Sequence, residues 1–210
     1  MTDRDIATIV DAVLASAVGD VVPIVTAGDP VLRTPAAAYD FSLPSTTFTR
    51  LLTVMTATMH DAPGVGLAAT QIAIPLQLAV IEDLYDVDPA VASVRERTPQ
   101  PFRVLVNPSY EGIEGTRSFY EGCLSMPGYQ AVVQRHAAVR LRCLDETGAR
   151  VDERFDGWPA RIVQHETDHL GGTLYIDRAE IRSLAENATY ARLWNNPSPQ
   201  DAAHALQFPL

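Results

Sequence analysis

Residues 158–170, WPARIVQHETDHL, decide how this chain is interpreted, because they join a helix signal to a pair of histidines. Proline suits the first turn of a helix, and the Gly-Gly pair after Leu170 is a typical helix end. Residues four apart lie one turn above each other, so His165 and His169 can direct two imidazoles at one cation. Glu166 lies beside the first histidine and can act there as an acid or base. The H-E-x-x-H motif therefore predicts a metal site in the middle of a helix.

The third ligand decides the class of site, since a catalytic metal takes three protein ligands and leaves one position open. Cys123 is one candidate, because a glycine precedes it and a Pro-Gly turn follows, which would expose the sulfur. Glu186 is the other, and it would make the protein a zinc endopeptidase. A third interpretation is a metal-binding module without catalysis. Cys143 alternates within an apolar strand pattern and is predicted to lie in the core.

A glycine-rich segment, GVGLAATQ at 64–71, is the second element with chemical potential. Two glycines allow a substrate backbone to approach closely, and Gln71 supplies an amide donor. The segment lacks the Lys-Ser/Thr pair of a phosphate-binding loop. A purely structural metal site needs neither an acid/base nor an amide donor, so Glu166 and Gln71 together favour an enzyme.

Composition limits the class of protein. At 210 residues with 47% apolar content, the chain suits a single domain with its own core. No apolar run approaches the roughly 20 residues that span a membrane, and residues 1–5 are net acidic, unlike a secretion signal. Two cysteines make no disulfide framework. We therefore expect a cytoplasmic protein without a membrane partner. The formal net charge of −10 argues against direct DNA binding, and Arg140 and Arg142 are expected on a solvated face.

Hydrophobic periodicity indicates both helices and strands, and we interpret the chain as an α+β fold with short mixed or antiparallel sheets around one central helix that carries the H-E-x-x-H motif. An amphipathic helix is expected over 6–18, and a longer one over 45–60 with Ser45 as its cap. The remaining expectations are strands at 76–82, 103–107, 138–145 and 149–155, a surface loop at 83–101, a polar helix from about 177 to 194, and a tail from 195.

Three motifs of this chain, taken in order, resemble those of the peptide deformylase family. They are G-x-G-x-A-A-x-Q at 64–71, E-G-C-x-S at 121–125 and Q-H-E-x-x-H at 164–169. The resemblance covers about 22–180 as the core of one domain spanning 1–210. It leaves an N-terminal helical extension at 1–20 and a C-terminal helix and tail at 182–210.

The resemblance implies a metal-dependent hydrolase that removes formate from N-formylmethionyl termini of nascent proteins. Cys123, His165 and His169 would hold one divalent metal, Fe²⁺ natively, while Zn²⁺, Ni²⁺ or Co²⁺ also suits such ligands. Glu166 would be the acid/base. The remaining implied roles are an oxyanion hole made by the Gln71 side chain and the Leu124 backbone N–H, and substrate contacts at Val65 and Gly66.

Two further expectations concern the substrate and a partner. Trp158 and Ile162 share a helix face with His165, so they are predicted to wall the pocket for the methionine side chain. Family members that dock on ribosomes often end in a basic helix, whereas the C-terminal segment here mixes Arg192 with acidic residues. We therefore expect at most a transient contact with the ribosome.

Overall fold

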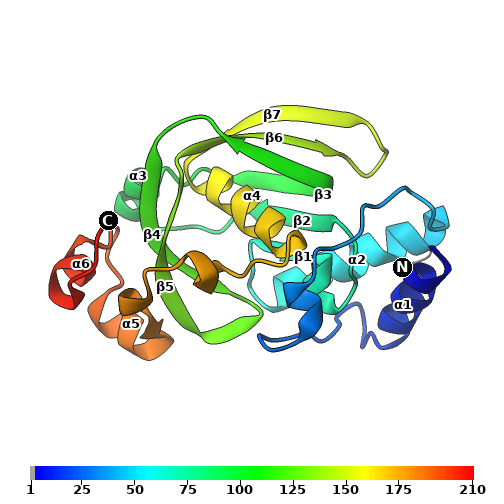
Figure 1. Cartoon of the computed structure of the whole chain (residues 1–210), viewed down its shortest axis with the longest axis horizontal. Helices are drawn as coiled ribbons and strands as arrows, with labels where there is room; N and C mark the ends of the chain where they lie inside the picture. Colours follow the sequence, from blue (N-terminus) through cyan, green and yellow to red (C-terminus); the bar gives the residue numbers. More distant parts are fainter. Residues whose placement is uncertain (1–2) are drawn as a thin grey trace.

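The computed structural model describes residues 3–210, with side chains from Ile6 onward. Helix α4 (Gly157–Leu170) lies at its centre, enclosed by two antiparallel sheets (Figure 1). The other helices are α1 (Asp3–Ala15), α2 (Ser45–Asp61), α3 (Pro89–Arg95), α5 (Asn187–Leu193) and α6 (Gln200–Leu206), with 3-10 turns at η1 (Pro30–Arg33), η2 (Ala69–Ile72), η3 (Tyr175–Arg178) and η4 (Ile181–Ser183). No helix within residues 3–210 has the length and apolar character needed to span a bilayer.

The larger sheet has five strands in the order β1 (Gly66–Ala68), β2 (Leu78–Asp83), β3 (Gln100–Gly112), β6 (Ala138–Leu144) and β7 (Arg150–Asp156). The smaller sheet joins β4 (Thr116–Cys123), β5 (Met126–His136) and β8 (Ala185–Glu186). Every pairing between these strands is antiparallel. The predicted α+β class, with sheets around one central helix, is confirmed.

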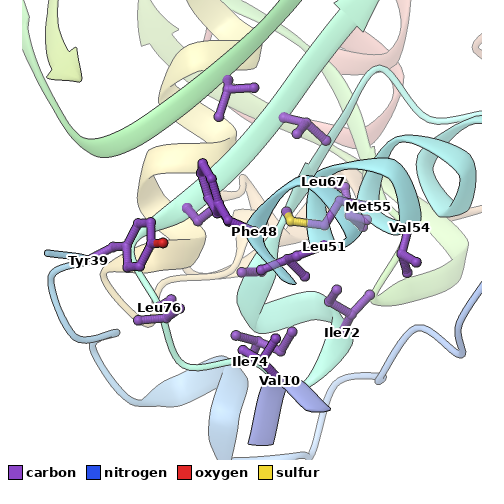
Figure 2. Packing of buried hydrophobic residues seen from close by; sticks show 14 of the residues in the cluster. Val10, Tyr39, Phe48, Leu51, Val54, Met55, Leu67, Ile72, Ile74 and Leu76 are labelled. Atoms are coloured by element: carbon purple, nitrogen blue, oxygen red, sulfur yellow. The ribbon is translucent and has the colours of Figure 1, made fainter. Parts of the chain in front are cut away.

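A first apolar core fixes the glycine-rich segment. The predicted stripe of α2 is buried at Phe48, Leu51, Met55 and Met59, and Figure 2 shows several of these side chains packed against Leu67 and Ile72. Burying one such side chain fully contributes about 1.5–3 kcal/mol. The backbone from β1 to η2 is therefore held rigidly against α2.

A second core lies between α4 and the larger sheet. Ala160, Val163 and Leu170 of α4 pack there with apolar side chains of β2, β3 and β6. Cys143 belongs to this cluster and is 7% exposed, as predicted. Arg140 and Arg142, in contrast, are exposed and pair with Asp152 on the outer side of the sheet. One side of α4 thus packs against the larger sheet, and the other side faces the β4–β5 hairpin.

Two local predictions were wrong, and a third was right in kind but displaced along the chain. Ser45 is the first residue of α2, and Pro44 stands at the cap position without a side-chain bond. The expected loop at 83–101 contains α3, whose start is marked by Asp88, a side-chain cap, and by proline at the first helical position. The helix expected over 6–18 is α1, shifted toward the N-terminus, and the first two residues of the predicted extension lie outside the described part of the chain.

The C-terminal segment also differs from the prediction. Between 177 and 194 the chain forms turn η4, strand β8 and only then α5, and the expected tail contains α6. Strand β8 exists because its backbone pairs with β5, at Tyr129 and Gln130. The β4–β5 hairpin was not predicted either, although it carries Cys123. Cross-strand partners, rather than local periodicity, stabilise both features.

Candidate metal centre

Cys123, His165 and His169 converge in the structure. Cys123 ends β4, and the two histidines lie one turn apart in α4. Their potential ligand atoms all lie within 4.8 Å of one another, and Cys123 Sγ is 3.2 Å from His169 Nε2. One sulfur and two imidazole nitrogens suit Fe²⁺, Zn²⁺, Co²⁺ or Ni²⁺ better than Mg²⁺ or Ca²⁺, which prefer oxygen ligands. The predicted ligand cluster is therefore compatible with a single transition-metal ion.

Glu121 orients the first histidine. Its Oε2 lies 3.1 Å from His165 Nδ1, which leaves Nε2 of that ring for the ligand cluster. Burial opposes ionisation of Glu121, but Arg135 and Arg161 hold its pKa well below the usual value. Their guanidinium nitrogens lie 2.9 and 2.5 Å from Glu121 Oε1. The buried Glu121 carboxylate, both of whose oxygens are paired, thus fixes the orientation of the His165 imidazole.

Glu121 is the first residue of the E-G-C-x-S motif, but the sequence did not predict a role for it. One signal was present: residues two apart on a strand point to the same face, so Glu121 and Cys123 face α4 together. The partners Arg135 and Arg161 carried no such signal, because they come from another strand and from α4.

Glu166 is buried beside the ligand cluster, with 3% of its surface exposed. Burial is the main cause that raises the pKa of this carboxyl to about 7. Its Oε1 lies against Gly66, where an added Cβ would come within 2.3 Å of that oxygen. Its Oε2 has no hydrogen-bond partner among the described residues. A carboxyl with one free oxygen and a near-neutral pKa is suited to exchange protons at pH 7.

Gln71 points its amide at the cysteine. Its Oε1 accepts a hydrogen bond from Ala68 N–H at 2.9 Å, and this fixes the orientation of the amide. Its Nε2 lies 3.7 Å from Cys123 Sγ and 3.3 Å from Ser125 Oγ. The side chain is 1% exposed. It therefore presents a preorganised N–H donor next to the ligand cluster.

One cavity of about 620 Å³ brings these groups to a common space. All the residues predicted to contact a substrate line it, as do two of the three predicted ligands and the two groups suited to catalysis. The predicted residues on its wall are Val65, Gly66, Gln71, Cys123, Leu124, Trp158, Ile162, His165 and Glu166. Arg95, Tyr129 and Asn187 also line the cavity, and sequence reasoning missed them.

Glu186 takes a different part in the structure. Its carboxylate accepts hydrogen bonds from the backbone N–H groups of Ala188 and Thr189, at 3.0 and 3.2 Å, and so caps α5. Within residues 3–210 it does not belong to the ligand cluster. The alternative of a zinc endopeptidase with Glu186 as third ligand is therefore wrong.

Clustered sulfur and nitrogen ligands, a buried carboxyl with a near-neutral pKa and a fixed amide donor around one cavity define a metal-dependent hydrolase. The fold and the similarity to known proteins narrow this class to one family.

The profile of the polypeptide deformylase family matches residues 21–184. Peptide deformylase 1 of Streptomyces coelicolor is 61% identical over 195 residues, which are 92% of this chain and 89% of that protein. Peptide deformylase 3 of Streptomyces avermitilis is 57% identical over 208 residues, 99% of this chain and 92% of that protein. The chain therefore belongs to the polypeptide deformylase family, the metal-dependent hydrolases that remove the N-formyl group from nascent peptides.

Solved structures of the family share the fold. The class I type b peptide deformylase of Acinetobacter baumannii with Met-Ala-Ser bound is 34% identical and superposes with a TM-score of 0.67, over 75% of this chain and 98% of that one. The enzyme of Synechococcus elongatus in complex with actinonin is 31% identical with a TM-score of 0.62, over 89% and 86%. Helix α1 and the segment from Ala185 onward lie outside the range that the family profile matches.

Proposed function

We propose that this chain releases formate from N-formylmethionyl termini with one metal ion, Fe²⁺ natively, held by Cys123, His165 and His169. The observation that supports it is the convergence of these three side chains, two of which line a cavity together with Glu166 and Gln71. Zn²⁺, Ni²⁺ and Co²⁺ fit the same donor set and should also support turnover to differing extents.

Glu166 is proposed as the acid/base of this reaction. When bound, the metal would supply Lewis-acid chemistry and lower the pKa of a water molecule toward neutrality. Glu166 would take a proton from that water and deliver it to the amine that leaves. A carboxyl whose burial brings its pKa to about 7 is matched to both transfers.

Gln71 and Leu124 are proposed to stabilise the charge that develops on the formyl oxygen. The Gln71 amide is already oriented by Ala68, so its N–H needs no rearrangement during the reaction. The backbone N–H of Leu124 follows the ligand Cys123 directly and would be the second donor. Donors fixed in advance act mainly in the transition state.

The peptide backbone is proposed to align with Val65 and Gly66. Strand β1 begins at Gly66 and is an edge strand of the larger sheet, where it pairs with β2, so an extended chain would add along its other edge. An added strand gains main-chain hydrogen bonds that do not depend on side chains. The peptide Met-Ala-Ser in the A. baumannii structure shows that a relative binds such a ligand.

Trp158 and Ile162 are proposed to contact the methionine side chain. Both line the cavity on the helix face that carries His165, and Ile162 is 3% exposed. An indole and a branched aliphatic chain offer the apolar surface and the sulfur–aromatic contact that a thioether favours.

The chain is proposed to work as one domain over 1–210, with a core at about 22–180, in the cytoplasm where nascent proteins are made. We propose a transient contact with the ribosome, and we propose no membrane or DNA partner. Arg182 at the C-terminal end donates to the backbone of Leu206, so this cation is partly used within the chain.

Formate release from formyl-Met-Ala-Ser tests the function. Protein reconstituted with Fe²⁺, Zn²⁺, Ni²⁺ or Co²⁺ under anaerobic conditions should release stoichiometric formate and free Met-Ala-Ser. Acetyl-Met-Ala-Ser is the matched control, and it should be hydrolysed far more slowly. Internal cleavage of a longer peptide without formate would instead show an endopeptidase, and no turnover with any of the four metals would contradict the proposal.

A further inference from the structure

Trp158 lines the cavity, and three guanidinium groups contact its ring. The Cζ atoms of Arg95, Arg97 and Arg161 lie 5.3, 5.6 and 5.7 Å from the centre of its ring. Each distance allows a cation–π interaction. Arg161 comes from α4 itself, whereas Arg95 and Arg97 come from the segment 84–99 between β2 and β3. A segment distant in sequence thus determines where this indole lies.

The same segment also fixes the start of α4 through its backbone. The carbonyl of Glu96 accepts a hydrogen bond from Trp158 N–H at 3.2 Å. Asp156, at the cap position, makes no side-chain bond to the helix, so this carbonyl satisfies one of the free N–H groups of the first turn. The approach is close enough that a Cβ at Gly157 would lie 2.4 Å from the Glu96 oxygen. Gly157 has φ +57°, which glycine adopts without strain.

Arg95 differs from its two neighbours in what it binds. Arg97 makes a bidentate pair with Asp83, and Arg161 is paired with Glu121. Arg95 has no carboxylate partner among the residues whose side chains are described. Its Nε and Nη2 donate to the backbone carbonyls of Pro197 and Asn196, both at 3.3 Å, and Nη2 also lies 3.4 Å from Tyr190 Oη. Its guanidinium therefore connects the aromatic wall of the cavity to the C-terminal segment.

This connection closes one side of the cavity. Figure 1 shows α3 on the same side of the molecule as α5 and α6, and the hydrogen bonds of Arg95 join α3 to the segment between those two helices. Arg95 itself lines the cavity, and Asn187 from the start of α5 lines it too, held by Gln130 Nε2 at 3.3 Å. The wall around Trp158 is thus assembled from α3, α4 and the C-terminal segment, of which the last lies outside the family profile.

We propose that Arg95 is a positioning residue that sets the side-chain selectivity of the cavity. By holding Trp158 in one orientation and anchoring the C-terminal segment behind it, Arg95 keeps the wall at the distance that a long unbranched side chain contacts. This inference rests on the proposed placement of the methionine side chain against Trp158 and Ile162. Without Arg95 the indole gains other orientations, and a methionine chain loses its ordered contact while a methyl side chain, too short to reach the wall, loses little.

The test compares Arg95→Ala with the wild type on formyl-Met-Ala-Ser and formyl-Ala-Ala-Ser at equal metal content. The ratio of kcat/KM for the two peptides should fall roughly ten-fold, about the discrimination that one methylene contributes in an apolar pocket. The loss should arise from a higher KM for the methionine peptide, while kcat/KM for the alanine peptide changes much less. Arg103→Ala is the matched control, since Arg103 also makes a cation–π contact, with Phe155, but does not line the cavity, and its ratio should stay at the wild-type value.

Further variants separate the possible failures. If Arg95→Ala does not fold, Arg95→Gln keeps most of the stem and removes the cation, and the same ratio is measured on it. A lower melting temperature with an unchanged ratio overturns the inference, because it shows a structural role alone. Ile162→Phe, which narrows the cavity, should also shift the ratio. If Ile162→Phe shifts it and Arg95→Ala does not, Arg95 is excluded while the placement of methionine stands. If Ile162→Phe has no effect, that placement fails and this inference with it.

Discussion

Replacing Gln71 by leucine separates catalysis from stability at this site. Leucine keeps similar bulk but removes the Nε2 donor that lies 3.7 Å from Cys123 Sγ. Loss of one preorganised donor to a developing oxyanion typically costs about 10²–10³ in kcat, or roughly 2.7–4 kcal/mol. Because that charge is small in the ground state, KM should change much less than kcat.

Gln71→Leu should also lower the stability of the folded protein. Gln71 Oε1 is the acceptor for Ala68 N–H, and both groups are buried. Leaving a buried donor unsatisfied costs about 1–3 kcal/mol. For a chain of this size, each kcal/mol lowers the melting temperature by roughly 2–4 °C. Gln71→Leu should therefore lower the melting temperature by several degrees, in addition to its effect on turnover.

The assay measures kcat per folded, metal-loaded molecule and the melting temperature on one preparation. Gln77→Leu is the matched control, because the Gln77 side chain also makes a hydrogen bond to the backbone, donating to the Ala36 carbonyl at 3.3 Å, but does not line the cavity. It should reduce stability slightly and leave kcat at the wild-type level. An unchanged kcat in Gln71→Leu, whatever its melting temperature, would refute the assignment of Gln71 to the oxyanion hole.

Three other predictions concern the ligands and the glutamate. Cys123→Ala should abolish metal retention and turnover. Glu186→Ala should keep the metal and lose only the cap of α5, which would lower the free energy of unfolding by about 0.5–2 kcal/mol. Metal analysis of the purified proteins checks both expectations. Glu166→Ala should keep the metal but slow turnover by about 10²–10⁴-fold, and a folded yet metal-free variant would contradict an acid/base role. Gly66→Ala places a Cβ within 2.3 Å of Glu166 Oε1, so the displaced carboxyl should cost about 10²-fold in kcat with metal content unchanged; a wild-type rate would show that this position is not critical.

Local patterns were sufficient to predict the central helix and the pair of histidines that it carries. Proline in the first turn, a Gly-Gly end and histidines four apart depend only on residues within one helix, and α4 spans Gly157–Leu170 as expected. The apolar stripe of α2 was predicted for the same reason. Three short motifs in order also indicated the family, which the comparisons confirm. These features share one physical basis: a helix satisfies its own hydrogen bonds, so its periodicity is visible in the sequence.

Features that depend on a distant partner were decided only by the tertiary structure. The β4–β5 hairpin brings Cys123 to α4, and Glu121 reaches His165 across that interface at 3.1 Å. Strand β8 forms by pairing with β5, and α3 docks on Trp158 and on the C-terminal segment through Arg95. Each contact joins residues far apart in the chain, and an ion pair or a cation–π contact imposes no spacing along the sequence. The sequence by itself thus indicated the candidate ligands and the helix that carries two of them, while tertiary packing decided how those side chains are oriented and which residues line the cavity around them.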